Sequence, residues 1–425
     1  MSAYTSTPAD ERAALRIGML GAGGMAKSHA NAYLTIPHIF WPGHVRPALA
    51  AIAGRDESRV REAAVRYGFD RYTTDWRTLV ADAGIDVFDN VGPDALHVQP
   101  TLAAIQAGKH VACEKPLALS AVDCERLWRA AETRGVKHLA CFNYRFLPAV
   151  RLARTLIEQG ELGEVFEARF RYSQHRGMDP AAPPWSVGTL NAIGCHVIDQ
   201  ARFLLGEIAA VSAVVRGPMS QRRAEAGVDP GVPIDSVHMV VEFAGGAAGV
   251  LDTSSVASGR RNQLAWEING SRGSVAWDLE DLNVLRVQRR GGDARLDGFT
   301  DVIVCEDVHP LAGAWWDTAH LLGWEHGHVN MLAHFADAIA RDSPVEPYGA
   351  TFLDGLRDLR RARWRPGDGR RGPVGGSGRL SAAAGLVPLA PQSREQVDDG
   401  RQAHVQALHG TRGREPRVDG NPARR

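Results

Sequence analysis

Short apolar runs alternate with amphipathic stretches through the first third of the chain. Each run is long enough for a buried strand, and the stretches between them repeat apolar residues at helical spacing. The runs cover residues 16–20, 48–53, 86–90, 110–113 and 138–142. The helical stretches include residues 27–35, a pattern that ends near 107, and residues 120–134. Strands that alternate with helices in this way predict an α/β fold, the doubly wound parallel sheet of a Rossmann domain.

Beyond residue 163 the pattern changes to longer β-like runs. They cover residues 165–172, 209–216, 236–243, 248–255, 263–269, 274–277 and 284–289. Helical patterns precede them at 148–159, interrupt them at 189–205 and follow them at 329–340. A closing apolar helix is expected next, but the sequence becomes rich in arginine and glycine instead. The order predicts an α+β domain built on a large sheet.

The length of 425 residues is more than one hydrophobic core usually serves, so two domains and an appendage are expected. We place the Rossmann domain at 14–145, a second domain at 146–356 and a low-complexity tail at 357–425. No apolar run approaches the roughly 20 residues that a bilayer requires, and the N-terminus lacks a secretory signal. The five cysteines form neither a Cys-x-x-Cys pair nor an even framework, which is typical of reduced thiols. We therefore expect a cytoplasmic protein with no membrane partner.

Arginine, glycine, proline and alanine dominate the tail at 357–425. It holds 15 arginines and 7 acidic residues, so its charge is +8 and the rest of this chain of net charge +0 carries −8. A body of that sign gives no reason to expect nucleic-acid binding. We interpret the tail as disordered, or as out-of-frame translation of a GC-rich gene. A nucleic-acid-binding tail is the third alternative.

A glycine-rich motif lies between the first strand and the first helix. It is Gly21-Ala-Gly23-Gly24-Met25-Ala26, a Gly-x-Gly-x-x-Ala pattern in the strand–helix context of dinucleotide-binding turns. Gly21 permits the tight turn, Gly23 lets the backbone approach a pyrophosphate, and Ala26 lets helix and strand pack closely. The amides of the helix N-terminus would bind the phosphates. The motif predicts NAD or NADP as the cofactor.

The second strand ends at Gly54-Arg55-Asp56. NAD-binding domains usually carry an acidic residue at this strand end, where it binds the ribose 2′-hydroxyl. Gly54 leaves room for a 2′-phosphate and Arg55 offers it a bidentate cation, so the sequence favours NADP. Asp56 remains an alternative ribose partner, or a cap for the next helix.

The strand at 110–113 ends in Glu114-Lys115-Pro116. Proline cannot donate to a ladder, so it ends the strand and leaves Lys115 at the carboxyl edge of the sheet, where α/β sheets bind their ligands. A solvated lysine at an ordinary strand end is the alternative. The chain has only four lysines against 45 arginines, however, and a dinucleotide motif lies upstream. Lys115 is therefore a catalytic candidate.

Histidines provide further candidates. His196 lies in the amphipathic stretch 189–205, where a lone histidine is more often a packed core residue than a catalyst, so its role depends on whether it meets Lys115. Five others crowd one region: His309, His320, His326, His328 and His334. His326 and His328 are two residues apart at an expected helix start, which points their rings apart. We expect substrate contact or packing there, and no metal site.

Several motifs occur together in a fixed order over about residues 14–356. They are Gly21–Ala26, Gly92-Pro93-Asp94-Ala-Leu-His97, Glu114-Lys115-Pro116, Asn143-Tyr144-Arg145, Gly194-Cys-His196-Val-Ile-Asp199, Glu267-Ile-Asn-Gly-Ser-Arg-Gly273 and Gly323-Trp324-Glu-His326. In this combination the chain resembles the Gfo/Idh/MocA family, named for glucose–fructose oxidoreductase, inositol dehydrogenase and rhizopine catabolism. The last three motifs fit the branch that acts on glycosides and cyclitols.

The resemblance implies a fold and a reaction. The C-terminal half should carry a large, open, mainly antiparallel sheet that commonly serves oligomerisation, so a homodimer or homotetramer is expected. The reaction would transfer a hydride between NAD or NADP and a secondary ring hydroxyl of a sugar, glycoside, aminosugar or cyclitol. Lys115 would hydrogen-bond the reacting hydroxyl, and His196 would act as the general base. The resemblance also suggests a cis Lys115–Pro116 bond.

Binding residues follow from the same matches. Cofactor contacts are expected from Gly21, Gly23, Gly24, Met25, Ala26, Gly54, Arg55, Gly92, Pro93, His97, Glu114, Lys115, Pro116, Asn143 and Arg145. Substrate contacts are expected from Lys115, Tyr144, Asn191, His196, Asp199 and Trp324.

One position departs from the family pattern. The family usually has an aspartate four residues before the histidine, and this chain has Ala192 there. The departure raises an alternative to the dehydrogenase, which is a catalytically weakened regulatory protein of the same fold that binds cofactor and sugar.

Overall fold

The computed structural model describes residues 10–181, 187–229, 234–362 and 387–388. Within these ranges no helix is long and apolar enough to span a membrane. The interpretations of the tail beyond Ala362 lie outside the described residues, apart from the short strand β15 (Val387–Pro388).

Six parallel strands form the sheet of the N-terminal domain, in the order β3-β2-β1-β4-β5-β6. They are β1 (Ala14–Leu20), β2 (Arg46–Ala53), β3 (Arg71–Thr73), β4 (Val87–Asn90), β5 (His110–Cys113) and β6 (His138–Ala140). This is the strand order of a doubly wound Rossmann sheet, which confirms the predicted fold class. The sequence pattern missed β3, because three residues without a buried member give no periodic signal.

Five helices connect these strands. They are α1 (Gly24–Ile39), α2 (Glu57–Tyr67), α3 (Trp76–Ala81), α4 (Val98–Gln106) and α5 (Ala121–Arg134). Side-chain caps explain two of the starts, because Asp56 accepts from the Arg59 amide and Ser120 accepts from the Asp123 amide. Helix α1 has no such cap at Gly23.

A mainly antiparallel sheet is the frame of the C-terminal domain, as predicted. Its order is β14-β13-β12-β11-β7-β10-β9-β8-β15. The strands are β7 (Val165–Ser173), β8 (Ile208–Arg216), β9 (Ser236–Phe243), β10 (Ala248–Ser254), β11 (Gln263–Gly270), β12 (Gly273–Asp278), β13 (Val284–Arg289) and β14 (Thr300–Ile303). Strand β7 pairs with β10 in parallel. Burial alternates along β7 and β9, so one face packs on helices while the other faces outward.

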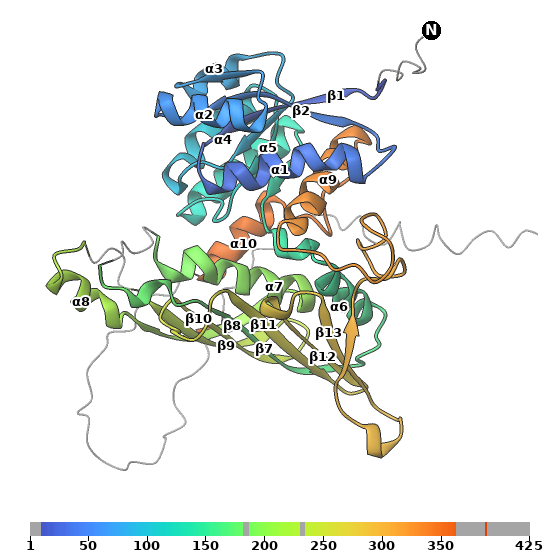
Figure 1. The fold of residues 1–425 in the computed structure, drawn as a ribbon. Helices are drawn as coiled ribbons and strands as arrows, with labels where there is room; N and C mark the ends of the chain where they lie inside the picture. The colour runs from blue at the N-terminus through green and yellow to red at the C-terminus, as the bar shows by residue number, and fades with distance from the viewer. Residues whose placement is uncertain (1–9, 182–186, 230–233, 363–386, 389–425) are drawn as a thin grey trace, which may run out of the picture. The chain divides into compact units, whose positions relative to one another are not determined.

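The helices of this domain are α6 (Pro148–Glu158), α7 (Cys195–Leu205) and α8 (Pro218–Glu225). Helix α7 lies over the sheet and contacts β7 and β10 (Figure 1). The sequence predicted one amphipathic helix over 189–205. The structure begins that helix with a π-helical turn (Leu190–Gly194) before α7 continues it. Such turns are frequent at functional sites.

Two C-terminal helices, α9 (His326–Ala340) and α10 (Phe352–Ala362), return to the Rossmann domain. Helix α9 packs on α1, and α10 contacts both α5 and α7. The expected closing helix is therefore present. The domain boundary placed at residue 356 cuts through α10, because Asp358 and Leu359 are buried. The arginines from residue 360 onward interrupt the apolar periodicity, so the sequence pattern did not indicate this helix.

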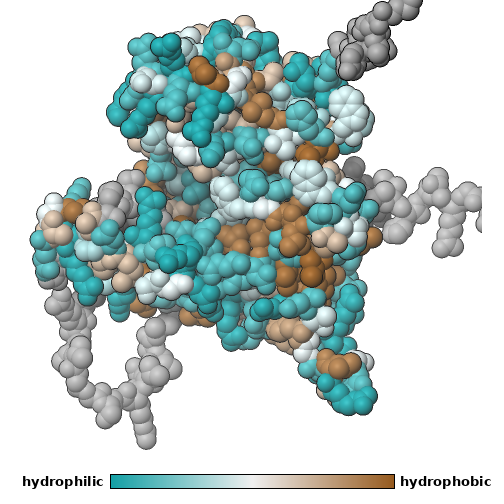
Figure 2. All heavy atoms as spheres, in the orientation of Figure 1, coloured by the Kyte–Doolittle hydropathy of each residue, from teal (hydrophilic) through white to brown (hydrophobic). Residues whose placement is uncertain are grey.

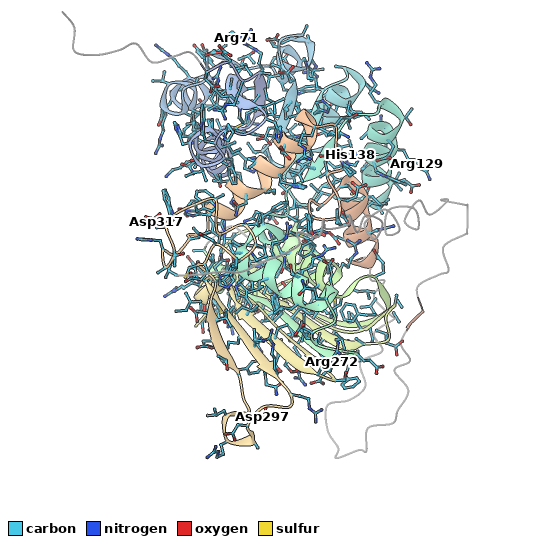
Figure 3. All side chains as sticks on the ribbon, turned by 90° about the vertical axis from the view of Figure 1, so that its right-hand side faces the viewer. Arg71, Arg129, His138, Arg272, Asp297 and Asp317 are labelled. Atoms are coloured by element: carbon cyan, nitrogen blue, oxygen red, sulfur yellow. The ribbon has the colours of Figure 1, made fainter. Side chains whose placement is uncertain are left out.

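Apolar side chains gather in Figure 2 near the segment between β14 and α9, while polar groups cover most of the rest of that face. The segment exposes Val308, Trp316, Leu321 and Trp324. Figure 3 shows the β13–β14 hairpin extending away from the sheet, with Asp297 near its tip.

Candidate active site

A cavity of about 490 Å³ lies at the carboxyl edge of the parallel sheet, where the turns after β1, β4 and β5 meet residues of the C-terminal domain. That volume is typical of small-molecule sites. The predicted site residues that line it are Met25, Glu114, Lys115, Pro116, Asn143, Tyr144, His196 and Trp324. The structure therefore brings Lys115 and His196 to one cavity, which was the condition for a catalytic role of the histidine.

Lys115 follows β5 and is half-buried. The Lys115–Pro116 bond is cis, as expected from the resemblance. The lysine Nζ donates to the Ala192 carbonyl across 2.9 Å. An ammonium has three donors, so two remain for a ligand in the cavity. Ala192 belongs to the π-helical turn, which thus anchors the lysine from the opposite domain.

His196 is the second residue of α7, directly after the π-helical turn. Its ring lies among three aromatic rings, with centroid distances of 5.7 Å to Phe142, 4.8 Å to Tyr144 and 5.8 Å to Tyr172. Burial, and then the charge of Lys115, holds the pKa of His196 well below its ordinary value. The imidazole is therefore neutral at physiological pH and able to accept a proton.

Hydrogen bonds of fixed direction connect five cavity residues. The indole of Trp324 donates to the Tyr144 hydroxyl over 3.3 Å, and the Tyr172 hydroxyl donates to Asn262 Oδ1 over 2.8 Å. The 3.0 Å bond between the tyrosines must then run from Tyr144 to Tyr172, since Tyr172 has only one proton. Gln174 Nε2 also donates to Asn262 Oδ1. Sequence reasoning missed Tyr172, Gln174 and Asn262.

A signal for two of these residues exists in the strand pattern. Burial in β7 falls on Ala168, Phe170 and Tyr172, so period-2 alternation extends to Gln174 just past the strand end. A polar residue that continues a buried face at a strand end is a site candidate. Asn262 lies in a loop, and no local pattern indicates it.

The glycine-rich turn fits a dinucleotide. Gly21 has φ +119, and a Cβ there would lie 2.7 Å from the Val91 carbonyl oxygen, so only glycine fits. A Cβ on Gly23 or Gly24 would meet nothing within 4 Å, which leaves open space at the start of α1. The first turn of α1 has neither a side-chain cap nor an acidic residue. Its free amides can bind phosphate oxygens.

The end of β2 lies beside this turn, because the Gly21 amide donates to the Ala53 carbonyl. Asp56 caps α2 and accepts from Arg59 N at 3.1 Å, as expected from one of its two alternatives. Arg55 is exposed.

His97 connects two of the turns that the sequence assigned to cofactor binding. Its Nδ1 lies 2.8 Å from the Pro116 carbonyl oxygen, and its Nε2 lies 3.1 Å from that of Gly92. The ring is buried, so it fixes the two turns to each other. Neither His97, Gly92 nor Pro93 lines the cavity.

Three predicted contacts are placed elsewhere by the structure. Arg145 and Asp199 form a buried bidentate ion pair, with Nε 2.9 Å from Oδ1 and 3.1 Å from Oδ2. Neither residue lines the cavity. Each buried side chain instead neutralises the charge of the other. Asn191 donates to the Val187 carbonyl and also lies outside the cavity lining. These three residues therefore make structural contacts and do not line the cavity.

A buried histidine lies behind the cavity wall. His29 on α1 has Nδ1 2.9 Å from Asp89 Oδ2 and Nε2 3.1 Å from Glu114 Oε1. Burial opposes its charge, but the two carboxylates outweigh that effect and raise its pKa to about 10. Burial and the nearby His29 lower the pKa of His328 to about 3.

Together with Glu114, the two histidines have the ligand atoms of a candidate metal cluster, all within 4.8 Å of one another. A doubly hydrogen-bonded imidazolium has no lone pair for a metal, so the geometry favours a proton-holding network instead. His328 itself lines the cavity, in agreement with the substrate contact considered for it.

The Rossmann order, the open glycine-rich turn and the lysine–histidine cavity define the class: the chain is an NAD-binding oxidoreductase. It belongs to the Gfo/Idh/MocA family. A match to "Oxidoreductase family, NAD-binding Rossmann fold" covers residues 15–142, and a match to "GFO/IDH/MocA C-terminal domain" covers residues 150–276.

Two characterised relatives align over most of their length. The chain is 35% identical to levoglucosan dehydrogenase of Pseudarthrobacter phenanthrenivorans, over 81% of this chain and 93% of the relative. It is 30% identical to inositol 2-dehydrogenase of Rhizobium meliloti, over 81% and 94%. A solved levoglucosan dehydrogenase in complex with NADH and levoglucosan is 34% identical, with a TM-score of 0.77, over 81% of this chain and 94% of that one.

The relatives bear on the cofactor. Two solved levoglucosan dehydrogenase structures are complexes with NADH, and this chain has the NAD-binding fold of the same family. The preference for NADP expected from Gly54 and Arg55 stays a prediction.

Proposed function

We propose that this protein oxidises a secondary ring hydroxyl of an uncharged sugar, glycoside or cyclitol with a nicotinamide cofactor. The observation that carries the proposal is the meeting of Lys115 and neutral His196 in one cavity beside the open glycine-rich turn. The relatives named for levoglucosan and inositol support this substrate class.

The two side chains divide the proton chemistry. Lys115 is anchored on the Ala192 carbonyl and donates to the substrate hydroxyl oxygen, so it stabilises the alkoxide as the proton leaves. His196 accepts that proton, a role worth typically 10²–10⁴-fold. When bound, the nicotinamide supplies the hydride acceptor. Gly21, Gly23 and the first amides of α1 would hold its pyrophosphate.

The substrate class follows from the cavity wall. Gln174, Asn262 and Trp324 offer neutral hydrogen-bonding groups. Glu114 is already paired with His29, and Lys115 serves the reacting hydroxyl. Arg176 also lines the wall, but most of the lining groups are neutral, so the cavity fits a polyhydroxylated neutral ring best.

A substrate panel tests this assignment. The protein would be mixed with NAD⁺ or NADP⁺ and with neutral sugars, anhydrosugars and inositols, alongside aminosugars and sugar phosphates. We expect kcat/KM to be highest for a neutral ring compound. A sugar phosphate as the best substrate would refute the substrate class.

Ala192 supports a second function, a cofactor- and sugar-binding regulator without turnover. An enzyme and a regulator would both bind cofactor and sugar. Only the enzyme would change the absorbance at 340 nm, so this measurement separates the two functions.

We also propose a homo-oligomer, a dimer or tetramer formed through the outward face of the large sheet. This face exposes Val240 on β9 and Val250 on β10. Light scattering during gel filtration, with Val240→Lys as the disrupting variant, tests it.

All five cysteines are free thiols, which supports a cytoplasmic location.

A further inference from the structure

The buried chain Asp89–His29–Glu114 is not used by the proton chemistry above. It joins β4, the glycine-motif helix α1 and the residue before Lys115. Asp89 and His29 are fully buried, and Glu114 reaches the cavity as part of its lining. Glu114 Oε1 is held by His29, while its Oε2 accepts from the Lys115 amide at 3.2 Å. Both carboxylate oxygens are thus fixed.

We propose that His29 and Asp89 are positioning residues that hold an ionised Glu114 in the cavity, where its charge favours the oxidised, cationic nicotinamide over the reduced, neutral one. The proposal rests on the proposed function, because hydride transfer requires the ring to enter the cavity that holds Lys115 and His196.

Charge balance gives the physical reason. Oxidised nicotinamide is a cation and would share the cavity with the Lys115 ammonium. Glu114 is the buried carboxylate beside both, so it offsets this repulsion in a site of low dielectric. The reduced ring is neutral and gains little from the same carboxylate. Burial would protonate an unsupported Glu114, and the hydrogen bond from His29 keeps its pKa below the ordinary value instead.

The dissociation constants of NAD⁺ and NADH, measured separately by calorimetry without substrate, test this. In Glu114→Gln we expect the ratio Kd(NAD⁺)/Kd(NADH) to rise roughly tenfold, because one unit charge is lost near the ring. Tenfold corresponds to about 30 mV in the potential of the bound two-electron couple. A ratio that moves less than twofold overturns the role of the charge.

Two further variants test the positioning. His29→Leu removes the hydrogen-bonding cation between the buried Asp89 and Glu114. Burial then favours a protonated Glu114, and we expect the ratio to rise as in Glu114→Gln. The double variant His29→Gln with Asp89→Asn supplies neutral amide hydrogen bonds in place of the ion pairs, so Glu114 stays held and ionised. We expect its ratio within about threefold of wild type. If the folded double variant instead shows a Kd(NAD⁺)/Kd(NADH) ratio raised as far as in Glu114→Gln, His29 and Asp89 do not act through Glu114.

The control is Glu132→Gln. Glu132 also pairs with a buried histidine of the Rossmann domain, His138 (labelled in Figure 3), at 2.9 Å, but it does not line the cavity. We expect its ratio to be unchanged. Should His29→Leu fail to fold, Glu114→Gln and the double variant still decide the proposal. A wild type that binds none of NAD⁺, NADH, NADP⁺ and NADPH refutes the proposed function, whereas normal binding with an unmoved ratio in Glu114→Gln refutes only this inference.

Discussion

In the proposed mechanism Lys115 and His196 act from opposite domains, and neither has the carboxylate neighbour that the family pattern places at position 192. The carbonyl of Ala192 fixes the lysine, and aromatic rings fix the histidine. Both catalytic side chains are therefore oriented, but the imidazolium formed during catalysis has no anionic partner at this position. We expect such a site to be slower than one with an aspartate at position 192.

Substitutions at the two catalytic positions should separate their roles. His196→Ala should lower kcat by at least about 10²-fold, within the range for a lost general base. Lys115→Ala should also lower kcat strongly, because alkoxide stabilisation is lost. Ala192→Asp should raise kcat. Steady-state kinetics check all three, and a nearly silent His196→Ala would assign the proton chemistry to Lys115.

The pH profile follows from the pKa of His196. The base must be neutral, and its lowered pKa means that protonation removes activity only well below the ordinary value of about 6.5. The acid limb of kcat/KM should thus lie below pH 6.5. Ala192→Asp places an anion near the imidazole, which raises its pKa and moves the limb upward. A wild-type limb at or above 6.5 contradicts this assignment.

Residue-level prediction from sequence worked where the chain itself dictates a geometry. Gly21 needs a positive φ, and the proline after Lys115 ends a strand. Local rules were therefore enough to identify Gly21 and Lys115. Arg145 and Asp199 were assigned to ligand binding, because their pairing with each other is visible only in three dimensions. Asn262 was missed because a loop carries no period.

At the level of elements, α10 joins the domains through buried ion pairs. Arg202 of α7 pairs with Asp358 of α10 at 2.5 Å and with Glu207 at 2.8 Å. Asp354 of α10 lies 3.2 Å from the same guanidinium. These contacts hold α7, and with it His196, against the C-terminal helix.

Removal of the central cation should destabilise the fold. In Arg202→Ala the buried Asp358 loses its ion-pair partner, and the partly exposed Asp354 and Glu207 lose one of theirs. The free energy of unfolding should fall by about 3–5 kcal/mol. Urea unfolding followed by circular dichroism measures it. The matched control is Arg286→Ala, which breaks an exposed pair with Asp301 and should cost within about 0.5 kcal/mol. Equal losses in the two variants would contradict the role of the buried network.

The larger elements were predictable from periodicity, and those that depend on tertiary contacts were not. Strands β5, β9 and β13 have the predicted bounds, since each is an uninterrupted β-like run. The π-helical turn at Leu190–Gly194 has an ordinary helical sequence, and its geometry coincides with the Lys115 contact to Ala192.

At the scale of the whole molecule, we expect the end of β2 to determine whether NAD or NADP is preferred. We expect NADP to bind at least as well as NAD, because Asp56 is occupied as a helix cap and Arg55 is exposed beside the glycine-rich turn. Arg55→Ala should weaken NADP binding by roughly tenfold and leave NAD binding unchanged. Fluorescence titration measures both, with Arg61→Ala on α2 as the control. An NAD preference that survives Arg55→Ala would show that Arg55 does not contact a 2′-phosphate.

The central claim is that this molecule oxidises a ring hydroxyl of a neutral substrate by transferring a hydride from the carbon that bears it, and absorbance at 340 nm tests it most directly. Wild type and Lys115→Ala would be mixed with NAD⁺ or NADP⁺ and the neutral sugar and inositol panel, with cofactor binding verified separately. We predict reduced cofactor in the wild-type reaction and a rate at least about 10²-fold lower in the variant. Binding of cofactor and sugar without any absorbance change across the panel would contradict the claim and identify a regulator.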